Sequence, residues 1–113
     1  MSEHTEQVAL MQWLRLQHPK AEAVTTASAN GGSRNAREAA NLKRSGVKAG
    51  YPDLFIAVPS AGFHGLFIEY KTLKGSLQAN QREWLANLND QGYLAVCCKG
   101  LDEARTLINY YLK

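Results

Sequence analysis

The stretches Gly50-Tyr51-Pro52-Asp53 and Phe67-Ile68-Glu69-Tyr70-Lys71 decide the fold of this 113-residue chain. Each borders a short apolar run, residues 54–58 and 66–70, of the length and composition typical of a β-strand. Residues 59–65 contain proline and glycine, which favour a hairpin turn between the two runs. The runs are therefore predicted to pair as antiparallel neighbours.

Charged residues stand out within this predicted hairpin. A strand that is otherwise apolar rarely carries charge on a buried face without a reason. Glu69 and Lys71 are two residues apart, so they point to the same side of the sheet. If the hairpin turns near Ala61 and Gly62, Asp53 lies almost opposite Lys71 and diagonal to Glu69. All three side chains are then expected on one face, at one end of the two strands.

Helices and strands are predicted on either side of the hairpin. Pro19 ends the first helix, Gly46 follows the second, Ser76 caps the third and Gly92 ends it. The predicted helices cover residues 3–18, 34–43 and 101–112, with the third helix between Ser76 and Gly92, and the remaining strands cover residues 21–29 and 93–98. This order predicts one α/β domain over residues 1–113, with a mixed sheet flanked by helices.

Composition narrows the class of protein. A hydrophobic fraction of 45% is ordinary for a globular domain, and a net charge of +3 fits a nucleic-acid partner without requiring one. No apolar run approaches the ~20 residues of a membrane span, and the N-terminus lacks the pattern of a signal peptide. Cys97 and Cys98 are adjacent, which disfavours a disulfide and favours two buried strand residues. A reducing cytoplasm is the expected location.

The charged groups of the hairpin suit metal-dependent chemistry. Two hard carboxylates, Asp53 and Glu69, match the ligand preference of Mg²⁺ or Mn²⁺, and the backbone carbonyl of Tyr70 could supply a further oxygen. Lys71 could position a water molecule or stabilise negative charge in a transition state. For Glu69 and Lys71 alone, a structural ion pair is the better interpretation; Asp53 behind a Gly-Tyr-Pro turn favours the functional one.

Pro52-Asp53 followed by Glu69-Tyr70-Lys71 resembles the PD-(D/E)xK nuclease signature. The wider pattern resembles the VRR-NUC family, and its matching features are an acidic first helix, Asn30-Gly31-Gly32 with nearby Arg34, Gly46 and Gly50 before Pro52, and later Gly75, Gln81 and Gly92-Tyr93. The family strand often reads Ile-Glu-aliphatic-Lys, whereas Tyr70 stands at the middle position here. The resemblance covers nearly the whole chain.

The resemblance implies a restriction-endonuclease-like fold and metal-dependent cleavage of structured DNA. For stand-alone members it implies a homodimer that acts on four-way (Holliday) junctions, in a bacterial or phage-infected host cell. It also implies a helical active-site glutamate, for which Glu3 and Glu6 are candidates, with Glu3 favoured by its spacing. The alternative for either residue is an acidic side chain favoured in a first helical turn by the helix dipole. Gln81 resembles the family's helical glutamine, which would hold the water or a phosphate; a solvated helix residue is the alternative.

Basic residues concentrate between the first helix and the hairpin. Asn30 and Gly31 belong to a loop whose backbone N–H groups could hold a phosphate without sequence preference. The predicted DNA-contacting cations are Arg34, Arg37, Lys43, Arg44, Lys48 and, after the second strand, Lys74. An ordinary solvated helix is the alternative for this segment.

Three functions remain open from the sequence. The first is a structure-selective DNA endonuclease dependent on Mg²⁺ or Mn²⁺. The second is a module of the same fold that grips branched DNA without cutting it, and a complete set of two carboxylates and a lysine argues against that function. The third is a protein-interaction domain with a structural Asp–Lys–Glu network, which predicts neither metal binding nor salt-sensitive DNA affinity.

Overall fold

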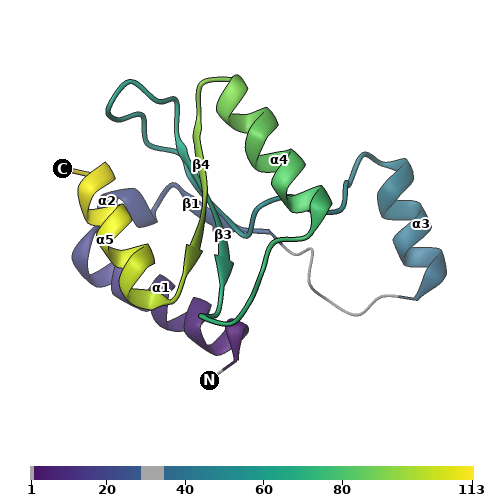
Figure 1. Ribbon diagram of the computed structural model, residues 1–113, viewed down its shortest axis with the longest axis horizontal. Coiled ribbons are helices and arrows are strands. Elements are labelled where there is room, and N and C mark those ends of the chain that lie inside the picture. Colours follow the sequence, from purple (N-terminus) through teal and green to yellow (C-terminus); the bar gives the residue numbers. More distant parts are fainter. Residues whose placement is uncertain (1, 29–34) are drawn as a thin grey trace.

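A computed structural model describes residues 2–28 and 35–113 as an α/β domain (Figure 1). The predicted order of helices and strands is confirmed, with one short helix added. The elements are α1 (Glu3–Gln17), α2 (Pro19–Glu22), β1 (Thr25–Ala27), α3 (Ala36–Arg44), β2 (Leu54–Ile56), β3 (Leu66–Lys71), α4 (Ala79–Asp90), β4 (Leu94–Lys99) and α5 (Leu101–Tyr111).

Four strands form one mixed sheet in the order β1-β2-β3-β4. β1 and β2 are antiparallel, β2 and β3 are antiparallel, and β3 and β4 are parallel. The parallel pair requires a crossover, which α4 provides. The mixed sheet flanked by helices is the predicted fold class.

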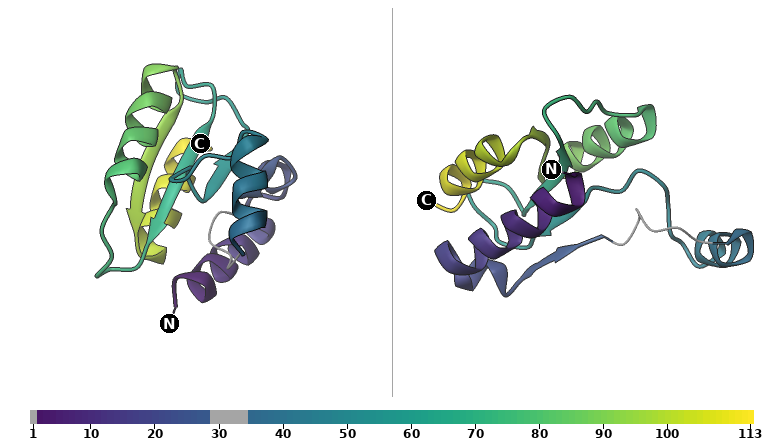
Figure 2. Two further views of the ribbon diagram at one scale, coloured as in Figure 1. Left: turned by 90° about the vertical axis from the view of Figure 1, so that its right-hand side faces the viewer. Right: turned by 90° about the horizontal axis from the view of Figure 1, so that it is seen from below.

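Strand alternation divides the core between the two faces of the sheet, and α1 and α5 cover one face while α4 covers the other (Figure 2). Leu66, Ile68 and Tyr70 of β3 are buried with residues of α1 and α5 on one face. Phe67 of the same strand is buried on the other face with Leu85 of α4. Glu69 and Lys71 share the parity of Phe67, so they lie on the α4 face.

The boundaries after α1 differ from the sequence prediction. Pro19 does end the first helix, but it also begins α2, because proline lacks only an N–H that a first helical turn leaves unpaired. The expected strand over residues 21–29 is therefore wrong in its first half, and β1 covers Thr25–Ala27. No helix in the described part of the chain is long and apolar enough to cross a membrane.

The start of α4 also differs from the prediction. The N-cap residue is Gln78 rather than Ser76, and α4 begins at Ala79. The Gln78 side chain accepts from the backbone of Gln81, and the Gln81 side chain accepts a 2.9 Å hydrogen bond from the Gln78 N–H. This capping box satisfies two N–H groups at the helix start, which a serine two residues before the cap does not reach.

Helix α3 stands apart from the sheet in Figure 1. Asn35 is its cap, because the Asn35 side chain accepts a 2.8 Å hydrogen bond from the Glu38 N–H. No residue of α3 is buried. Local propensity, capping and charge therefore hold this helix, rather than packing against the core.

Candidate active site

Two neighbouring strands bring Asp53, Glu69 and Lys71 to the α4 face of the sheet. The shared face is the one predicted, but the predicted register is wrong. Leu54 pairs with Ile68, so the next position places Asp53 opposite Glu69 rather than opposite Lys71. The two carboxyl groups are therefore direct cross-strand neighbours, with Lys71 diagonal to Asp53.

The hairpin explains the change of register. Its turn lies where the sequence predicts it: Ser60 and Phe63 form an isolated bridge around Ala61 and Gly62, both of which have positive φ. Three residues separate Ile56 from Ser60, whereas two separate Phe63 from Leu66. The additional residue on the first arm acts like a β-bulge and shifts the pairing of every residue beyond it.

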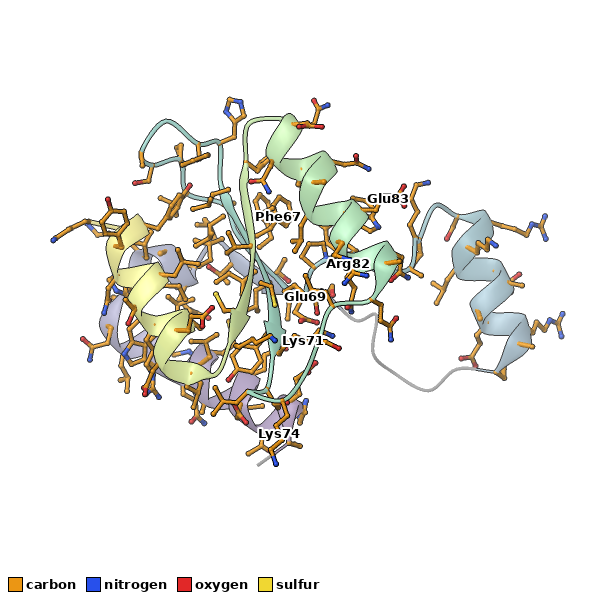
Figure 3. The ribbon with its side chains drawn as sticks, viewed as in Figure 1. Phe67, Glu69, Lys71, Lys74, Arg82 and Glu83 are labelled. Atoms are coloured by element: carbon orange, nitrogen blue, oxygen red, sulfur yellow. The ribbon has the colours of Figure 1, made fainter. Side chains whose placement is uncertain are left out.

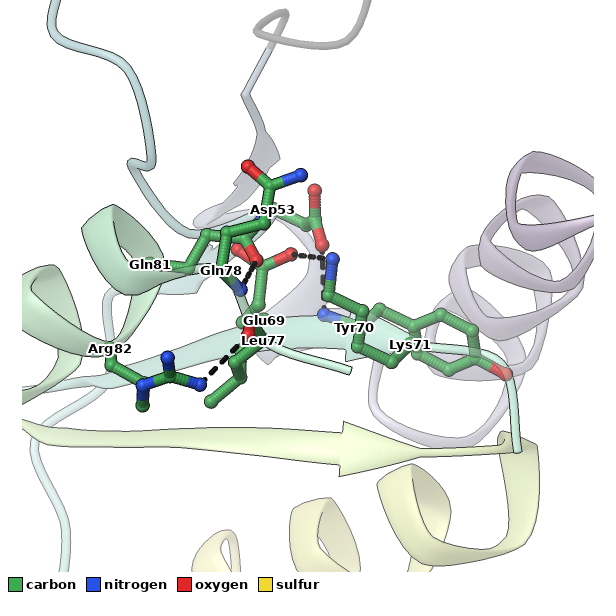
Figure 4. Close-up of polar contacts among 8 residues, drawn as sticks. All are labelled: Asp53, Glu69, Tyr70, Lys71, Leu77, Gln78, Gln81 and Arg82. Carbon is green, nitrogen blue, oxygen red and sulfur yellow. Dashed lines mark hydrogen bonds and ion pairs between the residues drawn. The ribbon is translucent and has the colours of Figure 1, made fainter. Parts of the chain in front are cut away.

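The main chain of Tyr70 faces Asp53. The Tyr70 N–H donates a 2.8 Å hydrogen bond to Oδ2 of Asp53 (Figure 4). The N–H and C=O of a strand residue point to the same edge, so the Tyr70 carbonyl also faces β2. The register places Pro52 opposite Tyr70, and proline has no N–H to donate to that carbonyl. The Tyr70 carbonyl, which is the predicted third oxygen ligand, thus faces the chain segment that carries Asp53.

Glu69 is the one buried charged side chain among the described residues, with an exposed fraction of 3%. Burial, a hydrogen bond to Asp53 and the Asp53 charge raise the pKa of Glu69 to about 9, although Lys71 opposes the shift. The hydrogen bond between the two carboxyl groups requires a proton on one of them. Without a cation, the pair is therefore held together by that shared proton.

Lys71 is mostly buried beside this pair, with 12% of its side chain exposed. Its Nζ lies 3.7 Å from Oε2 of Glu69, and the two residues lie along β3 near the start of α4 (Figure 3). The ion-pair interpretation of these two residues thus describes their geometry correctly. A lysine held this close to the Glu69 carboxyl group also offers N–H donors to an anion that binds beside it.

A cavity of about 760 Å³ opens at these residues and extends towards α3. Asp53 and Glu69 line it together with Glu3 from α1 and Gln81 from α4. Its outer wall is formed by α3 and the segment after it, including Lys43 and Lys48. Four separate parts of the sequence therefore meet around the two carboxyl groups.

The structure separates the two candidate helical glutamates. Glu3 lies in the cavity, where burial raises its pKa, Lys71 opposes that shift, and Asp53 and Glu6 add to it. Glu6 instead accepts a hydrogen bond from the Tyr70 hydroxyl on the opposite face of β3. The favoured residue, Glu3, is thus the one brought to the site, and its catalytic role stays a prediction.

Gln81 lies in the cavity as the resemblance implies, but its side-chain oxygen is already engaged in the α4 capping box. Its amide NH₂ remains the group with which it could contact a phosphate or water. Gln81 therefore has a structural role at the helix start, and the predicted substrate role depends on its NH₂ group.

The predicted DNA-contacting residues fall into three groups. Asn30, Gly31 and Arg34 lie outside the described residues. Lys43 and Lys48 line the cavity, whereas Arg37 and Arg44 lie exposed on α3 and do not line it. Lys74 is exposed beyond β3, beside a second cavity that Lys99 and Arg105 also line.

The donor set fits a hard divalent cation. Mg²⁺ and Mn²⁺ favour carboxylate and carbonyl oxygens, which Asp53, Glu69 and the Tyr70 carbonyl provide. A bound cation would also offset the electrostatic repulsion between the Asp53 and Glu69 carboxyl groups, which the shared proton offsets in its absence. Within residues 2–28 and 35–113, no three His, Cys, Asp or Glu side chains are arranged to hold a metal ion. The two carboxylates would therefore leave several positions for water and phosphate oxygens.

Two neighbours of the Asp53 segment were not predicted from the sequence. Ser28 lies opposite Asp53 just after β1, its N–H donates to the Asp53 carbonyl at 2.8 Å, and its hydroxyl is buried without a hydrogen-bond partner among the described residues. Trp84 donates from its indole N–H to the Ala49 carbonyl at 3.0 Å. The contact of Ser28 could not be predicted, because the pairing of a strand as short as β1 does not follow from its sequence. The contact of Trp84 was not predicted, because a tryptophan at helical spacing indicates core packing rather than a functional site.

Comparisons with known proteins agree with this fold. The family model of the VRR-NUC domain matches residues 1–102, which include Glu3, Asp53, Glu69 and Lys71. A solved structure described as a VRR_NUC domain protein is 34% identical and covers 99% of this chain and 88% of its own, with a TM-score of 0.88. No curated protein matches the chain.

Proposed function

This chain belongs to the VRR-NUC family, a nuclease-type family, and we propose that it is a structure-selective DNA endonuclease dependent on Mg²⁺ or Mn²⁺. The proposed substrates are branched DNAs, including four-way (Holliday) junctions, cut by phosphodiester hydrolysis. The observation that carries the proposal is the cross-strand pair of Asp53 and Glu69, which line one open cavity, with the Lys71 ammonium 3.7 Å from Glu69.

Each residue has a role in the proposed reaction that its position supports. Asp53 and Glu69 would hold the cation with the Tyr70 carbonyl, and the Tyr70 N–H fixes the orientation of Asp53. When bound, the cation would supply charge neutralisation and lower the pKa of a water molecule. Lys71 would donate to the phosphate or the attacking water, because its ammonium is held beside Glu69. Glu3 and Gln81 would orient that water from the helices.

The cavity wall opposite the carboxyl groups suits a DNA backbone. Lys43 and Lys48 offer two cations across the cavity from the proposed cation site. Such contacts neutralise phosphates without reading bases, which fits selection by DNA shape rather than by sequence. Arg37 and Arg44 would extend the contact along the exposed surface of α3.

A homodimer belongs to the same proposal. One site cuts one strand, and a two-fold dimer presents two sites to the two-fold related strands of a four-way junction. Tyr110 is 75% exposed and suits the dimer interface, whereas Tyr111 is buried and donates to the Val58 carbonyl.

A cleavage panel tests the proposal against a module that only binds. Labelled four-way junctions, flaps, splayed arms and linear duplexes would be incubated with the protein in Mg²⁺, Mn²⁺ or EDTA. We expect cleavage of branched substrates with either cation and none in EDTA or with Asp53→Asn. Binding of branched DNA without cleavage under every condition would favour the module, and absence of both would favour a protein-interaction domain.

A further inference from the structure

Asp53 reaches the site from a segment without regular structure. Residues 47–52 belong to no helix or strand, and β2 begins at Leu54, one residue after Asp53. The N–H groups of Ser28 and Tyr70, which lie on either side of Asp53 in the sheet, donate hydrogen bonds to Asp53 and hold it in place. The position of the preceding residues must therefore depend on contacts outside the sheet.

Helix α4 and strand β3 make those contacts. Trp84 donates its indole N–H to the Ala49 carbonyl at 3.0 Å. The Tyr51 ring lies nearly perpendicular to the rings of Trp84 and Phe67, at centroid distances of 5.0 Å and 5.7 Å. Such T-shaped pairs are favourable geometries for aromatic rings. The residues just before Asp53 are thus wedged between α4 and β3.

Gly50 lets this segment approach the helix closely. Its φ is +90°, and a Cβ atom built there would lie 2.9 Å from the backbone carbon of Asn80. A real Cβ does not approach backbone so closely, so the contact needs glycine for its space as well as for its φ. Gly46 has a similar φ of +110° and nothing within 4 Å of the same position.

Helix α4 therefore connects two sides of the cavity. Its first turn carries Gln81 in the cavity wall, and one turn later Trp84 holds the approach to Asp53. We propose that Trp84 is a positioning residue: it anchors the segment 49–51 to α4 and so fixes the Asp53 carboxylate opposite Glu69 for cation binding. This inference rests on the proposed function.

Trp84→Phe tests the anchor with little change of shape, because it removes the indole N–H and keeps an aromatic ring. Trp13→Phe is the matched control, since Trp13 is partly buried in α1 beside His18 and does not line the cavity. The measurement is Mn²⁺ binding to the metal-free protein by isothermal titration calorimetry, without DNA. We expect Trp84→Phe to raise the Kd about threefold to tenfold, the effect of one net hydrogen bond, and Trp13→Phe to leave it unchanged.

Kinetics then separate positioning from general damage. In Trp84→Phe the Mn²⁺ concentration for half-maximal cleavage should rise by the same factor, while kcat at saturating Mn²⁺ and the KM for DNA stay close to those of the wild type. A loss of kcat with unchanged Mn²⁺ affinity would overturn the inference. Equal Mn²⁺ affinity in both tryptophan variants and the wild type would also overturn it, while leaving the proposed nuclease intact.

A glycine pair gives an independent test if Trp84→Phe folds poorly. Gly46→Ala and Gly50→Ala impose a similar φ strain, but only the alanine at position 50 collides with Asn80. We expect weaker Mn²⁺ binding in Gly50→Ala than in Gly46→Ala, and equal binding in the two would contradict the inference. A wild type that binds no Mn²⁺ would refute the cation in the proposed function, and the inference with it.

Discussion

Replacing Glu69 with glutamine should remove a pH dependence from the stability of the metal-free protein. Glu69 is 3% exposed and hydrogen-bonded to Asp53, and its pKa lies near 9 rather than near 4.5. The native state therefore holds a proton that the unfolded state releases at neutral pH. Glutamine keeps the shape of the protonated glutamate and its ability to donate, without the titration.

The size of the effect follows from proton linkage. The stabilising contribution of protonated Glu69 is complete below pH 4.5 and is lost as the pH rises through about 9. One additional proton in the native state lowers the free energy of unfolding by about 1.4 kcal/mol per pH unit between those limits. From pH 6 to pH 8, Glu69→Gln should therefore gain about 2.7 kcal/mol relative to the wild type.

Urea denaturation at pH 6, 7 and 8 in EDTA measures this difference. Subtracting the free energies of the two proteins removes titrations that they share, including that of Glu3, whose pKa is raised by causes other than Glu69. Glu83→Gln is the matched control, because Glu83 is exposed on α4. It should follow the wild type at each pH. Mg²⁺ should stabilise the wild type, most strongly at pH 8, and should leave Glu69→Gln almost unchanged.

Parallel stability profiles for the wild type and Glu69→Gln would refute the shared-proton description of the site. A profile in which the wild type becomes more stable relative to Glu69→Gln as pH rises would refute the expected sign of the change in the free energy of unfolding with pH. The first result would mean that Glu69 is already ionised in the metal-free protein at pH 6, because Lys71 then outweighs burial and Asp53, so that neither the folded nor the unfolded state exchanges a proton at Glu69 between pH 6 and pH 8.

Other variants and hydrodynamic measurements test the remaining roles. Asp53→Asn should abolish cleavage in Mg²⁺ while retaining DNA binding in a mobility-shift assay; near wild-type cutting would remove Asp53 from the cation site. Lys71→Ala should lower kcat about 10²–10³-fold and change Mn²⁺ affinity little, and an unchanged kcat would assign Lys71 a structural role. Replacing Arg37 and Lys43 with alanine should flatten the log–log salt dependence of DNA binding by about 0.9 for each phosphate that the variant no longer neutralises, so an unchanged slope would place the DNA surface elsewhere. Sedimentation at micromolar concentration should show a dimer, whereas a monomer that cuts a four-way junction symmetrically would contradict the two-fold arrangement.

Strand parity made much of the candidate site predictable. Side chains alternate in any β-strand, so the common face of Glu69 and Lys71 followed from spacing alone. The cross-strand partner of Asp53 was predicted wrongly, because register depends on how many residues each arm of the hairpin uses before pairing begins. An irregular arm changes that number without changing the position of the turn.

Helix orientation was less predictable than helix position. Glu3 and Glu6 both lie in the first turn of α1, and helical periodicity does not decide which one faces the cavity. That choice depends on how α1 lies against the sheet, which is set by buried contacts of Leu10 and Leu14 distant in sequence from the site. The hydrogen bond from Trp84 to Ala49 could not be predicted for the same reason, since the two residues are 35 positions apart along the chain.

Tyr70 connects the helix that carries Glu3 to the strands that carry the other carboxyl groups. Its hydroxyl donates to Glu6 on the α1 face, and its N–H donates to Asp53 at the strand edge. An aliphatic residue, which the family often has at this position, would keep the second bond and lack the first. Burial of the Tyr70 ring leaves its hydroxyl dependent on Glu6 for a partner. The tyrosine therefore links the orientation of α1, and with it the approach of Glu3, to the same strand that holds Glu69.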